Sequence, residues 1–239
     1  MAYQLAVPQF ASRGLHTVFA CRSEVCPISG QSPAEELVNV LTHGLGLLLS
    51  VAGVSVLIVL ASIYGNVWHI VGSSVYGASL ILVYAASTFY HSSRSLEHKR
   101  VLKQVDQAVI FLLIAGTYTP FTLGPLNGGW GWSLFGVAWG VAVVAMALKV
   151  TFEGRFKAVA IPLYVGLGWM CIVGIVPLIH NVPLTGLLWL AFGGAAYSLG
   201  TIFFRWRALP FHHALWHVTV ILGSLFHYFA IMFYVVPLA

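Results

Sequence analysis

Seven long apolar segments run along the chain, and they restrict what it can fold into. They lie near residues 40–63, 69–92, 105–124, 130–149, 159–179, 184–204 and 214–237. Each holds about 20 residues, the length that an α-helix needs to cross roughly 30 Å of hydrocarbon. Strands of membrane barrels are shorter and alternate between polar and apolar side chains. The sequence therefore predicts an all-α membrane protein, a seven-transmembrane helix bundle.

The composition and the breaks between the segments support this interpretation. Charged residues make up only 7% of the chain and hydrophobic residues 59%, whereas soluble domains carry about 25% charged residues. Residues 1–33 show no sustained periodicity, so we expect an N-terminal cytoplasmic tail there and a transmembrane domain over residues 34–239. The expected breaks are Gly65-Asn66, Arg94–Lys103, residues 124–129, Thr151–Lys157, residues 181–183 and Arg205–Pro210.

The basic residues follow alternate breaks, which predicts the orientation of the bundle. They come after the second, fourth and sixth segments: Arg94, Lys99, Arg100, Lys103; Lys149, Arg155, Lys157; Arg205, Arg207. The other breaks and the C-terminal residues contain no lysine or arginine. Because cytoplasmic loops are enriched in basic residues, we expect a cytoplasmic N-terminus and an external C-terminus in the plasma (cell inner) membrane. The net charge of +5 is explained by topology, and no nucleic-acid partner is expected.

This orientation disfavours a rhodopsin-like receptor. Such receptors cross the membrane in the opposite sense. The last apolar segment of this chain also has no lysine that could hold retinal.

A pair of histidines, His213 and His217, opens the last apolar segment. Residues four apart lie on the same face of a helix, so the two imidazoles could bind one metal ion together. The alternative is a pair of histidines that hydrogen-bond to lipid headgroups or backbone at the membrane boundary.

Other segments bring polar residues to the same depth. His91 ends the second segment, with Ser87 one turn earlier, and Asp106 begins the third. With the predicted orientation, these residues and the histidine pair share one layer just inside the cytoplasmic face. Ionisable groups within a span are costly and usually face the bundle interior. The alternatives are a carboxylate that is favoured at a helix N-terminus and a serine that bonds back to its own helix.

Three imidazoles with one open position are typical of catalytic zinc sites. The sequence therefore predicts a Zn²⁺ site with His91, His213 and His217 as ligands. A nearby carboxylate such as Asp106 could act as general base or orient a ligand. A water molecule at the open position would be the nucleophile, and Ser87 could hydrogen-bond to this water or to an oxyanion.

The first segment adds a polar stripe of Glu36, Asn39 and His43 on one helix face. We expect these residues to support the metal ligands or to fix the first helix against the last. Glu35 pairs equally well with Asn39, and a capping or headgroup role is the alternative. The remaining histidines are expected outside the site: His69 and His180 at the outer boundary, His227 deeper in the last segment, and His16, His98 and His212 in the tail or loops.

Motifs spread over the chain after residue 33 resemble the hemolysin III family, the bacterial branch of the progestin and adipoQ receptor family. The first runs from Glu35 to Gly44, with Asn39 and His43 in it, and the second from Ser87 to His91. The others are residues 106–121 and the pair His213 and His217. The resemblance implies an intramembrane zinc site near the cytoplasmic face, with His91, His213 and His217 as ligands and Asp106 and Ser87 around the open position.

The resemblance and the residues lead to a first hypothesis of a zinc-dependent hydrolase of lipid amides or esters, similar to ceramidases, with a membrane lipid as substrate. The second hypothesis is a non-catalytic lipid-homeostasis or receptor-like protein in which zinc is structural. A third is a membrane-perturbing, haemolysin-like protein.

Overall fold

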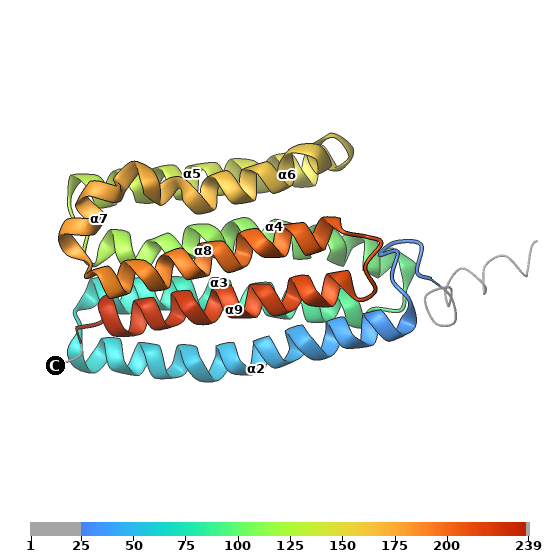
Figure 1. Cartoon of the computed structure of the whole chain (residues 1–239), viewed down its shortest axis with the longest axis horizontal. Helices are drawn as coiled ribbons and strands as arrows, with labels where there is room; N and C mark the ends of the chain where they lie inside the picture. Colours follow the sequence, from blue (N-terminus) through green and yellow to red (C-terminus); the bar gives the residue numbers. More distant parts are fainter. Residues whose placement is uncertain (1–24, 238–239) are drawn as a thin grey trace, which may run out of the picture.

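The structure is a computed structural model that describes residues 25–237 and, within them, all side chains except those of residues 153–155 and 157. The described chain is an antiparallel bundle of helices without strands (Figure 1). Its elements are α2 (Pro33–Tyr64), α3 (Val67–Ser92), α4 (Leu96–Leu123), α5 (Gly129–Thr151), α6 (Glu153–Gly168), the 3₁₀ helix η1 (Trp169–Gly174), α7 (Ile175–Asn181), α8 (Leu184–Arg205) and α9 (His212–Tyr234).

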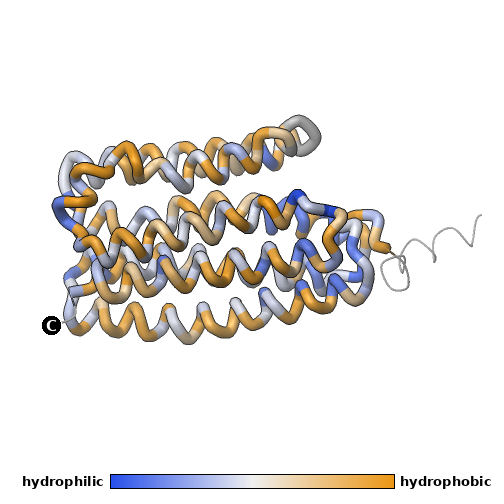
Figure 2. The backbone as a smooth tube through the Cα atoms, viewed as in Figure 1, coloured by the Kyte–Doolittle hydropathy of each residue, from blue (hydrophilic) through white to orange (hydrophobic). Residues whose placement is uncertain are grey.

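Seven stretches of helix in residues 25–237 are long and apolar enough to cross a membrane. Large apolar side chains remain exposed along their outer faces, including Leu48 at 70% and Leu184 at 71%. Apolar residues recur along the helices between their more polar ends (Figure 2). In water such exposed apolar surfaces would favour aggregation, whereas in a membrane they contact lipid. The prediction of a seven-helix, multi-pass integral membrane protein is confirmed.

The fifth membrane-crossing stretch, Ala158–Asn181, is not one regular helix, because α6 passes into η1 at Trp169. The hydroxyl of Tyr118 on α4 compensates for this change. It accepts a hydrogen bond from Cys171 N (2.8 Å) and lies 2.9 Å from the carbonyl oxygen of Gly168. Backbone groups in hydrocarbon must be satisfied within the protein, so Tyr118 stabilises the irregular backbone.

Two helices begin earlier than the hydropathy pattern predicts. Helix α2 begins at Pro33, where Ser32 and Glu35 form a capping box. Helix α4 begins at Leu96 after the N-cap Ser95, so most of the charged run that we expected to be a loop is helical. Asp106 is therefore well inside α4, and the prediction that it lies at a helix N-terminus is wrong.

The helices pack so that α2, α3, α4 and α9 surround the main core, whereas α5 to α7 form an outer layer beside α4 and α8 (Figure 1). Helix α9 lies between α2 and α8 and also contacts α4 (Figure 1). The last helix of the chain is thus brought against the first, and the polar ends of α2, α3 and α9 meet at one end of the bundle.

The orientation in the membrane remains a prediction, and reporter fusions test it. A reporter fused after Ala239 should be active only outside the cytoplasm, and one inserted near Glu97, in the exposed first turn of α4, only inside. The start of α4 and the end of α9 lie at opposite ends of the bundle, and the basic residues favour the cytoplasm. The reverse pattern of activity would contradict the predicted orientation.

Candidate metal centre

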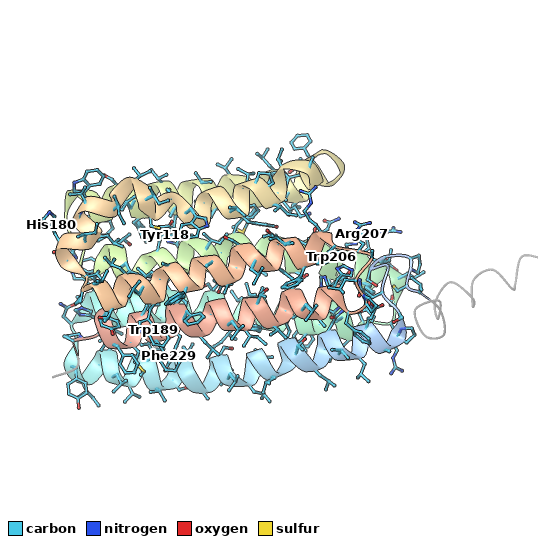
Figure 3. The ribbon with its side chains drawn as sticks, in the orientation of Figure 1. Tyr118, His180, Trp189, Trp206, Arg207 and Phe229 are labelled. Carbon is cyan, nitrogen blue, oxygen red and sulfur yellow. The ribbon has the colours of Figure 1, made fainter. Side chains whose placement is uncertain are left out.

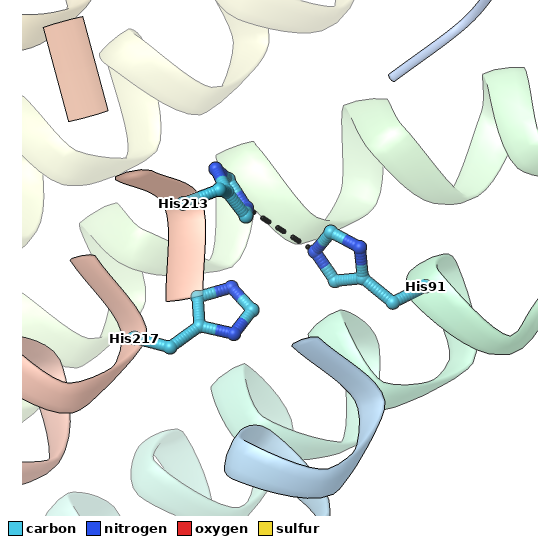
Figure 4. Close-up of side chains that lie close together, drawn as sticks. All are labelled: His91, His213 and His217. Atoms are coloured by element: carbon cyan, nitrogen blue, oxygen red, sulfur yellow. Dashed lines mark hydrogen bonds between the residues drawn. The ribbon is translucent and has the colours of Figure 1, made fainter. Parts of the chain in front are cut away.

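Three histidines from two helices converge at the end of the bundle where α2 begins. His91 is near the end of α3, and His213 and His217 occupy the first two turns of α9. One ring nitrogen from each lies within 4.8 Å of the other two. His213 Nε2 is 3.2 Å from His91 Nε2, and Figure 4 shows the three rings around one point. The cluster could hold a metal ion.

A buried carboxylate holds the far side of the His91 ring. Glu36 Oε2 on α2 lies 2.7 Å from His91 Nδ1, and Glu36 Oε1 lies 2.9 Å from Lys99 Nζ on α4. Because the Nδ1–H donates to the carboxylate, the lone pair of Nε2 is directed toward the cluster. Metal-binding histidines commonly have such a partner on their second nitrogen.

His217 has an equivalent partner, Thr42 on α2. Its Nδ1 lies 3.0 Å from Thr42 Oγ1. The Thr42 hydroxyl is also within hydrogen-bond distance of the backbone oxygens of Val38 (2.9 Å) and Asn39 (3.0 Å). Its hydrogen can be donated to one of these carbonyls, which leaves the oxygen to accept from His217 Nδ1. The Nε2 lone pair of His217 is then available to a metal ion.

His43 and Asn39, the other members of the polar stripe on α2, make contacts that differ from that of Thr42. The His43 ring stacks on the His217 ring, with centroids 3.5 Å apart and planes inclined by 13°. Asn39 is fully buried, and within residues 25–237 the side-chain nitrogen and oxygen atoms of both residues have no hydrogen-bond partner. The polar stripe predicted on α2 therefore faces the histidines.

The structure distinguishes the two glutamates that the sequence left open. Glu36 contacts His91, whereas Glu35 caps its own helix and accepts a hydrogen bond from Phe211 N at 3.2 Å. The two side chains therefore have separate roles, one at the cluster and one at the helix end.

Ser87 and Asp106 flank the cluster on α3 and α4. The Asp106 carboxylate is close enough to Ser87 and His91 to interact electrostatically with both. Ser87 is buried, and its hydroxyl makes no hydrogen bond to its own helix, so the predicted alternative for this serine is not observed. Asp106 does not belong to the group of converging ligand atoms among the described residues, so it lies beside the candidate ligands and not among them.

Two polar residues near the site were placed in loops by the sequence analysis, and both placements are wrong. Lys99 lies in the first turns of α4, is 1% exposed and donates to the carbonyl of Tyr90 as well as to Glu36. His212 is the first residue of α9 and is buried beside Gln31. Sequence spacing gives no signal that separates Lys99 from its exposed neighbour Arg100.

The other histidines lie away from the cluster. His227 lies 3.3 Å from the carbonyl oxygen of Leu190, His69 caps the start of α3, and His98 is an exposed residue of α4, not of a loop. Figure 3 shows His180 at the end of the bundle opposite Arg207. His16 lies outside the described residues.

An apolar cavity begins next to the cluster. It is lined by residues of α3, α4, α6, η1, α8 and α9 and has a volume of about 110 Å³. Val83 is one turn from Ser87, Ile110 is one turn from Asp106, and Val220 is one turn from His217. All three line the cavity, which therefore extends from the histidine layer toward the middle of the bundle.

Fold and site together define a class of protein: a multi-pass helical membrane protein with a buried three-histidine centre near one end of its bundle. The model of a protein family described as "Haemolysin-III related" matches residues 31–228. This region includes the three histidines, Asp106 and Ser87. The chain belongs to this family.

Individual relatives agree with this assignment. A "Hemolysin-3 homolog" of Bacillus subtilis (strain 168) is 41% identical over 202 residues, which cover 84% of this chain and 95% of the relative. "Hemolysin-3" of Bacillus cereus is 42% identical over 205 residues, covering 86% and 94%. "Monocyte to macrophage differentiation factor" of Homo sapiens is 28% identical over 84% of each chain. No solved structure matches the chain significantly.

Proposed function

We propose that this protein is a zinc-dependent intramembrane hydrolase that cleaves an amide or ester bond of a membrane lipid. The observation that supports the proposal most is the convergence of three imidazoles near the Asp106 carboxylate, one helix turn from residues that line an apolar cavity. In this proposal the histidines hold the metal, the carboxylate transfers a proton and the cavity binds the lipid chain.

The donor set favours zinc. Imidazole nitrogens suit zinc among the common divalent metals, and three protein ligands leave a fourth position open, as in catalytic zinc sites. No fourth His, Cys, Asp or Glu joins the group within the described part of the chain. His91 and His217 both have partners on their Nδ1 atoms, which prepares their Nε2 atoms as ligands.

When bound, zinc supplies an activated water and a Lewis acid for a carbonyl oxygen. The protein residues supply the rest. The Asp106 carboxylate accepts a proton from the attacking water and returns it to the leaving nitrogen or oxygen. The Ser87 hydroxyl, which makes no hydrogen bond to its own helix, donates to the carbonyl oxygen as negative charge develops there. Water and a lipid amide give a carboxylic acid and an amine.

The cavity indicates the class of substrate. Three apolar residues that line it, Val83, Ile110 and Val220, are each one helix turn from Ser87, Asp106 or His217. An acyl chain in the cavity is excluded from water, and its carbonyl is held at the histidine layer. Binding energy from the chain thus positions the scissile bond.

A structural metal is the second candidate function of the site, because the three ligands come from two helices. His91 lies on α3 and the other two lie on α9, so the metal would link the last turn of α3 to the first two turns of α9. In this case the ion would stabilise the bundle, and the neighbouring carboxylate would take no part in chemistry.

Product analysis of purified protein tests the hydrolase proposal. Protein reconstituted with zinc should release free fatty acid from at least one lipid in a panel of N-acyl sphingoid bases and glycerol esters. Addition of a chelator should abolish the release, and added zinc should restore it. Zinc-loaded protein that releases no fatty acid from any lipid of this panel would contradict the proposal.

A further inference from the structure

We infer that the loop of residues 25–32, which precedes the first helix, is part of the metal centre and that Ser29 is a positioning residue for it. The inference rests on the proposed metal site. The loop lies before the apolar segments, in the region where the sequence predicts only a tail, yet it contacts three helices.

Backbone hydrogen bonds close the loop on itself. Cys26 N donates to Gln31 O (2.9 Å) and Gly30 N donates to Cys26 O (2.7 Å). Gly30 has a φ of 74°, a left-handed conformation that glycine adopts at little cost. The turn therefore has a defined shape, and it presents the Ser29 side chain to α2.

Contacts on three sides hold the loop against the bundle. Lys103 Nζ on α4 donates to Ile28 O, Gln31 Nε2 lies 3.3 Å from His212 Nε2 on α9, and Ser29 Oγ donates to Glu36 Oε1 on α2. The loop thus joins the helices whose ends surround the histidines.

The hydrogen bond from Ser29 to Glu36 affects how the carboxylate contacts His91, one of the proposed metal ligands. Gln31 N donates to Ser29 Oγ at 3.2 Å, so the single hydroxyl hydrogen of Ser29 is available for Glu36. Ser29 and Lys99 both donate to Oε1 of Glu36, whereas His91 Nδ1 uses Oε2. Together the two donors fix the carboxylate with Oε2 toward His91. Ser29 therefore acts on the metal through Glu36 and His91.

Zinc affinity, measured by competition with a chromogenic chelator, tests this inference on the full-length protein in detergent. Ser29→Ala should raise the Kd for zinc by about 3- to 10-fold, less than the roughly 10- to 100-fold typical for loss of a direct partner of a ligand. Ser29→Thr keeps the hydroxyl and should restore affinity. The visible spectrum of the Co²⁺-loaded protein should change in Ser29→Ala and recover in Ser29→Thr.

Matched variants separate positioning from general stability. Ser92→Ala removes an exposed hydroxyl next to His91 that donates to Phe89 O in its own helix, and it should leave zinc affinity and the Co²⁺ spectrum unchanged. Gly30→Ala has space for its methyl group but strains the backbone, so it should weaken zinc binding without removing any side-chain contact. It also provides the test if Ser29→Ala fails to fold.

The outcomes distinguish this inference from the proposed function. Wild-type protein that binds zinc, together with wild-type affinity in Ser29→Ala or, if that variant does not fold, in Gly30→Ala, would overturn the role of the loop alone. Wild-type protein that binds no divalent metal would overturn both.

Discussion

Replacement of His213 by alanine is expected to empty the metal centre. Purified wild-type protein should contain about one zinc ion per chain, and His213→Ala should contain close to none, because loss of one of three ligands removes a bond and opens the geometry of the site. His91→Ala and His217→Ala should behave in the same way. Elemental analysis after dialysis against metal-free buffer measures the content.

His180→Ala is the matched control for the histidine variants. His180 is exposed in α7, at the other end of the bundle (Figure 3), so its loss should not change zinc content. Full zinc content in His213→Ala would show that the cluster is not the binding site.

Asp106→Asn is expected to separate catalysis from metal binding. The amide keeps the shape of the carboxylate but cannot accept a proton, and loss of a general base typically lowers a rate by about 10²- to 10⁴-fold. Asp106 is not one of the converging ligands, so zinc content and melting temperature should stay close to wild type. Fatty-acid release, zinc content and thermal stability are measured on the same preparation.

Glu97→Gln is the control for this change, since Glu97 is an exposed carboxylate near the start of the same helix. It should retain full activity. A structural metal predicts a different result: Asp106→Asn would either change nothing or lower zinc content and stability together. Normal fatty-acid release by Asp106→Asn would contradict the proposed role of this carboxylate.

Hydropathy predicted the seven membrane-crossing segments because exposing polar groups to lipid is costly, so each stretch of about 20 residues that crosses the membrane must be apolar. It could not locate the first turns of α2 and α4. Those turns are polar helix outside the apolar window, fixed by the N-caps Ser32 and Ser95. The change from α6 to η1 in the fifth segment was also not predicted, because it depends on the hydroxyl of Tyr118 from another helix.

The histidine cluster could be anticipated because four-residue spacing and depth are encoded locally. Its supporting contacts could not. Lys99 looks like a loop cation in the sequence, but it is buried because Glu36 and backbone carbonyls surround its ammonium group. Thr42 and Ser29 have no local pattern that marks them, and their roles come from packing between segments far apart in sequence.

The division of the three ligands between α3 and α9 has a consequence for biosynthesis. His91 and His213 are 122 residues apart, and at about 5–20 residues per second their synthesis is separated by roughly 6 to 24 s. A nascent chain that ends before α9 presents one imidazole and cannot close the site around an ion. At the proposed metal site, loading would therefore be a late event of assembly, and it would report that the last helix has packed against the bundle. Truncated or misinserted chains should be recognisable as metal-free protein.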